Sequence, residues 1–252
     1  MNLSISDTSV FRRLRIVLVD TSHPGNIGAV ARAMKTMGFS DLCLVNPRFK
    51  DALTHPEAIA FASGAQDILV GAKVFATIEE ALLDCHFVAA VSARLREFSP
   101  PIESPRQFAD RFAQAFDHPV ALVFGSERYG LPNDIVMKSN VLINVPANPE
   151  YSSLNLAQAV QILAYECRMS ILAKPSDAMP EMEIGFHGDV ASAQQIDGMY
   201  QHLEQALVKI NFLDPEHPKK LMPRLKRLFS RAQLEVEEVN IMRGISRKIL
   251  DL

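Results

Sequence analysis

The chain of 252 residues contains no tryptophan, and its three cysteines show no CxxC spacing. Its seven histidines form no HxxxH or HExxH pair, so no metal site is expected. Cysteines scattered through apolar segments are more often buried thiols than reactive ones, which fits a reduced setting. The chain also lacks an apolar run of about 18 residues, and its N-terminus lacks the apolar core of a signal peptide. We therefore expect a cytoplasmic protein that neither crosses a membrane nor is secreted.

A strong overall charge is also missing. The net charge is −3, with 48% apolar and 22% charged residues, which is the composition of an ordinary globular protein. A nucleic-acid partner must therefore be argued from local patches. One basic group is Arg12, Arg13 and Arg15, and a longer one is the segment 217–231, which holds six lysines and arginines and no acid.

Strands and helices alternate along most of the chain. Continuous apolar runs predict buried strands at 16–20, 42–45, 87–91, 120–124 and 141–145, with a weaker one at 74–76. Helices are predicted at 27–37, 56–62, 77–84, 104–116, 133–138 and 154–172, with caps at Gly38, Thr77 and Ser104. This alternation indicates an α/β fold with a doubly wound, mainly parallel sheet.

The alternation stops near residue 174, which divides the chain. Residues 1–173 form the predicted α/β domain, with 1–13 as a flexible start. Residues 174–193 are rich in prolines, glycines and acids without periodicity and predict a linker. Residues 194–252 carry helical patterns only, at 194–212, 217–231 and 234–250, and predict a small helical extension.

Three loops that follow strands lack the common nucleotide-binding motifs. The first holds Gly25-Asn26-Ile27-Gly28 instead of GxGxxG, which argues against a dinucleotide site. The second, GSERYGLP, has the spacing of a phosphate loop, but Leu131 and Pro132 stand where lysine and serine or threonine are needed. Ser126 is not in a GxSxG turn either. Because ligands bind beyond the carboxyl ends of parallel strands, we expect these loops to form one shared site.

Taken together, the loops resemble the three motifs of the SPOUT (SpoU-TrmD) class of RNA methyltransferases. Residues 26–33 (NIGAVARA) resemble motif 1, residues 124–132 (FGSERYGLP) motif 2, and residues 144–155 (NVPANPEYSSLN) motif 3. All three occur in order at strand ends, and the resemblance covers about residues 14–172. The string TSHPGNIGAVARAMKTMGF and the basic helical tail are similar to the TrmJ-type branch of tRNA 2′-O-methyltransferases.

The resemblance implies a sheet whose C-terminal part forms a trefoil knot. It also implies transfer of a methyl group from S-adenosylmethionine to the ribose of nucleotide 32 in the tRNA anticodon loop. The active form would be a homodimer in which the partner chain completes each site, with no membrane or DNA partner. The expected cofactor residues lie in loops 91–96, 124–130 and 143–155: Ser92, Ala93, Arg94, Gly125, Glu127, Gly130, Ile143, Val145, Pro146, Ser152, Ser153 and Leu154.

The resemblance also nominates a catalytic set: Asn26, Arg32, Glu127, Ser153 and Asn155. Arg32 would bind the target phosphate, because a guanidinium suits a bidentate phosphate contact, or it would act as the base. A guanidinium stays protonated in proteins, which favours positioning. Asn26 either caps the first helix or orients Arg32 or the ribose. Ser153 and Asn155 either cap the last helix or contact the cofactor and brace Arg32.

Basic side chains near these loops and in the extension are the expected RNA contacts. They are His23, Arg32, Arg94, Arg96, Lys220, Arg224, Arg227 and Arg231. The alternative for segment 217–231 is an apolar stripe, including Leu225 and Leu228, with an ordinary solvated face. Two other functions stay open: the same chemistry on ribosomal RNA, and a non-catalytic RNA-binding module.

Overall fold

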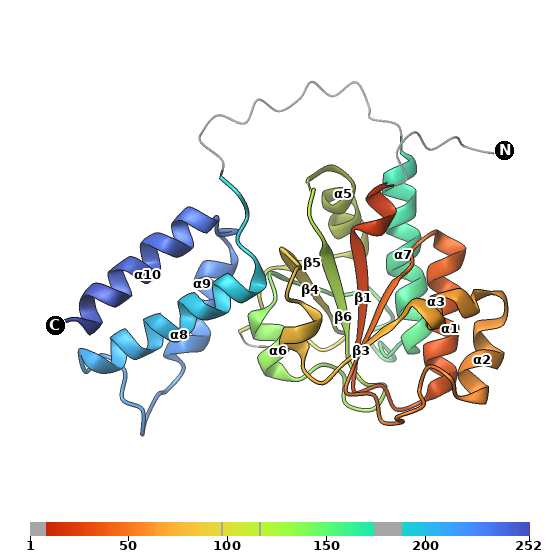
Figure 1. Ribbon diagram of the computed structural model, residues 1–252, viewed down its shortest axis with the longest axis horizontal. Coiled ribbons are helices and arrows are strands. Elements are labelled where there is room, and N and C mark those ends of the chain that lie inside the picture. Colours follow the sequence, from red (N-terminus) through yellow and green to blue (C-terminus); the bar gives the residue numbers. More distant parts are fainter. Residues whose placement is uncertain (1–8, 97, 116, 174–187) are drawn as a thin grey trace.

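In the computed structural model of the protein, seven parallel strands form one sheet in the order β3-β2-β1-β6-β4-β7-β5 (Figure 1). The structure describes residues 9–96, 98–115, 117–173 and 188–252. The strands are β1 (Leu14–Val19), β2 (Asp41–Val45), β3 (Lys73–Phe75), β4 (Phe87–Val91), β5 (Ile102–Glu103), β6 (Val120–Phe124) and β7 (Val141–Ile143). The predicted parallel α/β sheet is therefore confirmed.

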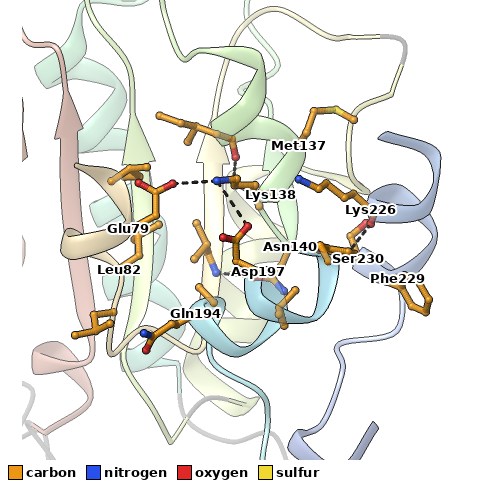
Figure 2. Close-up of a pocket in the computed structure, with 18 of the residues that line it drawn as sticks. Glu79, Leu82, Met137, Lys138, Asn140, Gln194, Asp197, Lys226, Phe229 and Ser230 are labelled. Atoms are coloured by element: carbon orange, nitrogen blue, oxygen red, sulfur yellow. Dashed lines mark hydrogen bonds and ion pairs between the residues drawn. The ribbon is translucent and has the colours of Figure 1, made fainter. Parts of the chain in front are cut away.

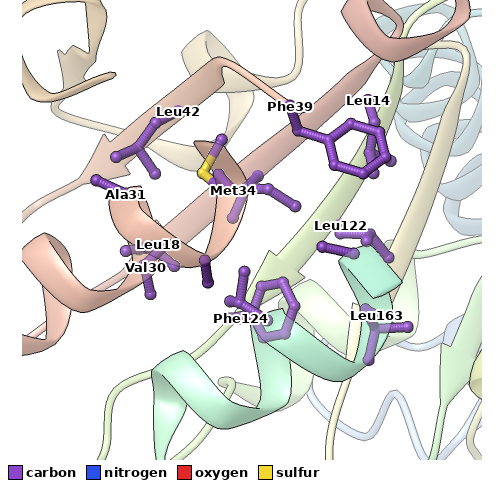
Figure 3. Packing of buried hydrophobic residues seen from close by; sticks show 14 of the residues in the cluster. Leu14, Leu18, Val30, Ala31, Met34, Phe39, Leu42, Leu122, Phe124 and Leu163 are labelled. Atoms are coloured by element: carbon purple, nitrogen blue, oxygen red, sulfur yellow. The ribbon is translucent and has the colours of Figure 1, made fainter. Parts of the chain in front are cut away.

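Helices cover both faces of the sheet. One face carries α1 (Pro24–Met37), α2 (Pro56–Ala62), α3 (Gln66–Gly71), α5 (Pro105–Ala115) and α7 (Leu156–Leu172); the other carries α4 (Ile78–Ala81) and α6 (Asn133–Lys138). On the first face Leu18, Met34 and Leu163 meet in the larger core (Figure 3). On the second face Val17, Val123 and Ile135 belong to a separate core. Burial on both faces explains why the central strands are continuous apolar runs.

Helix ends follow the residues that the sequence provides. Pro24 lies in the first turn of α1, where its missing N–H costs nothing, and Gly38 ends the helix at φ 89° in the left-handed region. Thr77 forms a capping box with Glu80 at α4. At α5, Gln107 N–H donates to Ser104 Oγ, and Ser104 N–H donates to Gln107 Oε1. These three predicted caps are confirmed.

The C-terminal helices are α8 (Ala193–Lys209), α9 (Leu221–Ser230) and α10 (Val236–Leu250), and they enclose a third core. The extension contacts the sheet region through main-chain bonds: Ala193 N–H donates to Cys85 O over 3.2 Å. His86 Nδ1 also lies 2.9 Å from Val190 O. The all-helical extension is thus confirmed, and it packs beside α6 on the second face of the sheet.

Several predicted boundaries were wrong or lie outside the described residues. The flexible start at 1–13 is wrong for Ser9–Arg12, which form a 3-10 helix with Phe11 buried; residues 1–8 are outside the described chain. Of the linker 174–193, only 188–193 is described, and Val190 there bridges to Glu235 of the extension. The short elements α3 and β5 were not predicted. The trefoil knot stays a prediction.

Two kinds of feature are absent from the described residues. No helix there is both long and apolar enough to span a membrane. No group of three His, Cys, Asp or Glu side chains in the same ranges is placed to hold a metal ion.

Candidate active site

Four loops meet at the carboxyl edge of the sheet. They follow β1, β6, β4 and β7, which are neighbours in the sheet, so residues far apart in the sequence come together there (Figure 1). This is the edge at which open α/β sheets bind ligands. The expectation that the loops form one shared site is consistent with this topology.

The loop after β6 is a tight turn built on two glycines. Gly130 has φ 69°, and its N–H donates to Ser126 O over 2.8 Å. A Cβ atom at Gly125 would lie 2.1 Å from the carbonyl carbon of Gly130, so no side chain fits there. The turn thus holds residues 126–129 in a fixed position at the mouth of the site.

A cavity of about 260 Å³ lies between the loops. The predicted cofactor residues that line it are Ser92, Ala93, Arg94, Gly125, Glu127, Gly130, Val145, Ser152, Ser153 and Leu154. The other two do not line it, and their role stays a prediction. Ile143 is fully buried in β7, where its carbonyl accepts from Ser92 N–H, and Pro146 is outside the cavity.

The lining contains further residues. Inside the predicted cofactor loops, but not named individually, are Val91, Arg96, Phe124, Ser126, Arg128 and Tyr129; outside those loops are Leu156 and Ala159 of α7. Ser126 and Tyr129 flank the Glu127-Arg128 pair of motif 2, and this position in the motif was the available signal. The apolar members come from strand ends and from α7, and they give the cavity a nonpolar wall beside its polar loops.

Glu127 is held by three hydrogen bonds. Its Oε2 accepts from Ser22 N–H (2.9 Å) and Ser22 Oγ–H (2.7 Å), and its Oε1 accepts from Asn26 Nδ2 (2.8 Å). Burial alone would raise the pKa of this carboxyl, but the donors from Asn26 and Ser22 outweigh it and hold the pKa below its ordinary value. Glu127 is therefore a fixed anion that joins motif 2 to motif 1.

Asn26 and Asn155 extend this network to motif 3. Asn155 Nδ2 donates to Asn26 Oδ1 over 3.1 Å. Asn155 Oδ1 caps α7 by accepting from Ala157 N–H. The capping role considered for Asn26 is wrong, because the N-cap position of α1 is His23 and Asn26 lies within the helix. Ser153 lines the cavity and does not cap α7.

Arg32 does not lie in the cavity. It is exposed on α1 and lines a neighbouring open hollow between α1 and α7, together with Ala29, Ala33, Ala157 and Gln158. Leu154 borders both spaces. Within one chain, the structure therefore separates Arg32 from the cavity residues.

Arg96 is anchored to the protein, whereas Arg94 is exposed. The Arg96 guanidinium donates to Asn133 Oδ1 (2.6 Å), Leu131 O (2.7 Å) and Arg94 O (3.1 Å). Burial and the charge of Arg94 lower the pKa of Arg96. Arg96 thus ties the loop after β4 to the loop after β6, and its role as an RNA contact stays a prediction.

The basic helix α9 and its flanks carry Lys220, Arg224, Arg227 and Arg231 at the surface. Lys220 Nζ and the Arg224 guanidinium lie 4.8 Å and 6.0 Å from the centre of the Phe98 ring, so they face the loop after β4. The predicted apolar stripe was wrong for Leu228, which is 57% exposed. His23 is also exposed, at the start of α1.

A larger cavity of about 530 Å³ lies between the extension and the second face of the sheet (Figure 2). Lys138 Nζ is 2.9 Å from Glu79 Oε1 and 3.7 Å from Asp197 Oδ1. Lys138 of α6 therefore links α4 on the sheet side of the cavity to α8 of the extension. Lys226 extends from α9 into the mainly apolar space, and burial lowers its pKa. None of the residues lining this cavity belongs to the loops of the candidate site.

Comparison with known proteins accounts for both parts of the chain. The model of the SpoU rRNA Methylase family matches residues 13–165, and the model of the tRNA methyltransferase TrmJ C-terminal domain matches residues 194–251. A protein of Pectobacterium atrosepticum, named tRNA (cytidine/uridine-2′-O-)-methyltransferase TrmJ, is 48% identical over 92% of this chain and 94% of its own. A protein of the same name from Klebsiella pneumoniae is 46% identical over 95% and 97%.

A solved structure supports the same relationship in three dimensions. The crystal structure of TrmJ from Z. mobilis ZM4 superposes with a TM-score of 0.78 at 34% identity, covering 94% of this chain and 98% of that chain. The sheet, the loops and the helical extension therefore have a common origin with that protein. The chain belongs to the SpoU family of RNA methylases and, within it, to the TrmJ-type proteins.

Proposed function

We propose that the protein is a cytoplasmic tRNA methyltransferase that transfers a methyl group from S-adenosylmethionine to the ribose 2′-oxygen of cytidine or uridine 32. The two curated relatives are named as tRNA 2′-O-methyltransferases, and this chain aligns with nearly their whole length. The observation that carries the proposal is the network from Ser22 and Asn26 to Glu127 and from Asn26 to Asn155, because it joins all three motifs beside one cavity.

The lining of the 260 Å³ cavity fits a nucleoside with a charged amino-acid arm. Val91, Phe124 and Leu156 supply an apolar wall for a base, and Ser92, Ser152 and Ser153 supply hydroxyls for the ribose and the arm. Glu127 adds a negative charge at the edge, which suits a sulfonium cation. Bound S-adenosylmethionine would supply an activated methyl group that needs no covalent help from the protein.

The chain's contribution is alignment. Glu127 fixes Asn26, Asn26 fixes Asn155, and Asn155 fixes the start of α7 beside Ser153 and Leu154, so the cavity mouth keeps its shape without substrate. Holding two reactants in line is sufficient for a large rate enhancement when the donor is already activated.

Arg32 would act on the substrate from a second chain. It is exposed toward an open hollow formed by α1 and α7, which has small and apolar members such as Ala29, Ala33 and Ile162. In a homodimer built through this surface, Arg32 of one protomer would reach the cavity of its partner, where its guanidinium would bind the phosphate next to the reacting ribose.

The first test is methyl transfer from labelled S-adenosylmethionine to unmodified tRNA, run beside ribosomal RNA, with nuclease mapping of the product. Label at a 2′-O-methylated nucleotide 32 is the expected result. Label only in ribosomal RNA would show that the protein methylates ribosomal RNA instead, which is the second candidate function. Cofactor binding without transfer to either RNA would favour the non-catalytic module.

A second test isolates Arg32. Arg32→Ala should abolish turnover and leave the Kd for S-adenosylmethionine nearly unchanged, because the proposed partner of Arg32 is the RNA phosphate and not the cofactor. Arg32→Lys keeps the charge but not the bidentate fork, and should recover only part of the rate. Turnover of Arg32→Ala equal to wild type would refute the assignment.

A further inference from the structure

A second hollow opens on the outer side of the 125–130 turn. It has a volume of about 700 Å³, with Ser22, His23 and Arg48 on one wall and residues 126–132 on the other. It shares Ser126–Gly130 with the 260 Å³ cavity, so the Glu127 carboxylate stands between the two spaces. A molecule in this hollow would be next to whatever reacts in the cavity.

Tyr129 is presented to solvent by this turn. Its side chain is 79% exposed, yet its backbone is fixed, since Tyr129 N–H donates to Ser126 Oγ over 3.2 Å. The Ser126–Gly130 bridge closes the turn behind it. An exposed aromatic ring carried on a fixed backbone is a platform on which unpaired bases stack.

Two guanidinium groups accompany the ring. Arg128 lies 5.3 Å from the centre of the Tyr129 ring, and Arg48 lies 5.7 Å from the Phe49 ring. Among the described residues neither has a carboxylate partner, although two carboxylates line the hollow. Glu127 is committed to Ser22 and Asn26, and Asp20 accepts from Asn46 Nδ2 over 2.7 Å. The positive charges are therefore available to an anion.

We propose that this hollow binds one unpaired nucleotide of the RNA next to the nucleotide that is methylated. The base stacks on the open face of Tyr129, and Arg48 and Arg128 bind the flanking phosphates. This inference rests on the proposed function and deepens it, because it assigns a substrate contact to Arg48, which is outside the cavity, and to Arg128 and Tyr129, which border both spaces. It places part of the selection for single-stranded RNA in the motif 2 turn itself.

The test compares Tyr129→Phe, Tyr129→Leu and Tyr129→Ala in the full-length protein. Binding of tRNA is measured by filter retention, independently of turnover, and binding of S-adenosylmethionine by calorimetry. Tyr129→Ala and Tyr129→Leu should weaken tRNA binding by roughly 5- to 100-fold, since one base no longer stacks. Tyr129→Phe should bind tRNA like wild type. Because Tyr129 also lines the cofactor cavity, tRNA binding of the variants is compared at equal saturation with S-adenosylmethionine, as set by the calorimetry.

The arginines are tested through salt dependence. Arg48→Ala with Arg128→Ala should make the slope of log K against log salt shallower by about one unit for each phosphate that the protein no longer binds. Lys73→Ala, at the start of the edge strand β3, is the control for the loss of one positive charge in either single arginine variant and should leave the slope unchanged. Wild-type tRNA affinity in Tyr129→Ala would overturn the inference even if the protein methylates tRNA. Absence of methyl transfer by wild type would instead count against the proposed function.

Discussion

Asn155 Nδ2 donates a hydrogen bond to Asn26 Oδ1 over 3.1 Å, while Asn155 Oδ1 accepts from the first turn of α7. One side chain therefore caps a helix and joins motif 3 to motif 1. The two roles can be separated, because aspartate is as good a cap as asparagine but has no N–H to donate.

We expect Asn155→Asp to keep near-wild-type stability and to lower kcat by about tenfold to a hundredfold, because Asn26 then has no donor on α7 and shifts. Asn155→Ala should show the same fall in activity and should also reduce the free energy of unfolding by about 0.5–2 kcal/mol, the usual value of an N-cap. Urea unfolding and single-turnover methyl transfer measure the two effects. Full activity in Asn155→Asp would mean that Asn155 only caps α7.

Glu127 gives a pH-dependent prediction. Its pKa in the folded protein is below the ordinary 4.5, so its hydrogen bonds stabilise the fold fully above that value, and this stabilisation disappears as pH falls through the folded pKa. Glu127→Gln removes this titration. The stability difference between wild type and Glu127→Gln should be constant from neutral pH to about pH 5.5 and should shrink below about pH 4.5. A difference that changes between about pH 6 and 8 would contradict the assignment.

The basic helix predicts two distinct charge-reversal phenotypes. Arg227 lies at the surface of α9, so Arg227→Glu should weaken tRNA binding, reduce the salt slope by about one unit and leave cofactor affinity unchanged. Lys220 lies over Phe98, so Lys220→Glu should also change cofactor affinity through the loop after β4. Equal salt slopes in wild type and Arg227→Glu would eliminate α9 as an RNA surface.

The cysteines should be inert in the native protein. Cys43, Cys85 and Cys167 are all fully buried, and burial raises the pKa of Cys43 and Cys85 to about 12. Only the thiolate reacts quickly with a disulfide reagent. At about pH 8 no thiol should react until the protein is denatured, and then all three should. One rapidly reacting thiol in the native protein would show that its segment opens.

Much of the fold was predictable because it depends on local patterns. Buried parallel strands are apolar throughout, and Gly38, Thr77 and Ser104 mark helix ends through local hydrogen bonding. The short elements α3 and β5 have too few residues to show a period. Arg15 shows the other limit: it belongs to a basic cluster in the sequence, but it lies buried in β1, paired with Asp41 and Asp84.

The candidate site also has a part that was predictable from local patterns and a part that depends on tertiary packing. Motif residues in the loops that follow strands, such as Gly125 and Ser153, could be placed at the cavity because the ends of parallel strands share an edge. The contact between Lys220 and Phe98 could not be predicted, since it depends on how the extension packs against the sheet region. The anchoring of Arg96 could not be predicted for the same reason, because its partners Asn133 and Leu131 are far from it in the sequence.

The 530 Å³ cavity beneath the extension affects how the sheet region would behave without helices α8 and α9. Its inner wall is apolar and belongs to the sheet region, with Phe75, Ile78, Leu82, Val88 and Ile135 facing the helices α8 and α9. In a chain that ended after α7, this wall would become a hydrophobic surface patch, and such patches promote self-association. Helices α8 and α9 cover this wall, so a truncated sheet region is expected to lose colloidal stability.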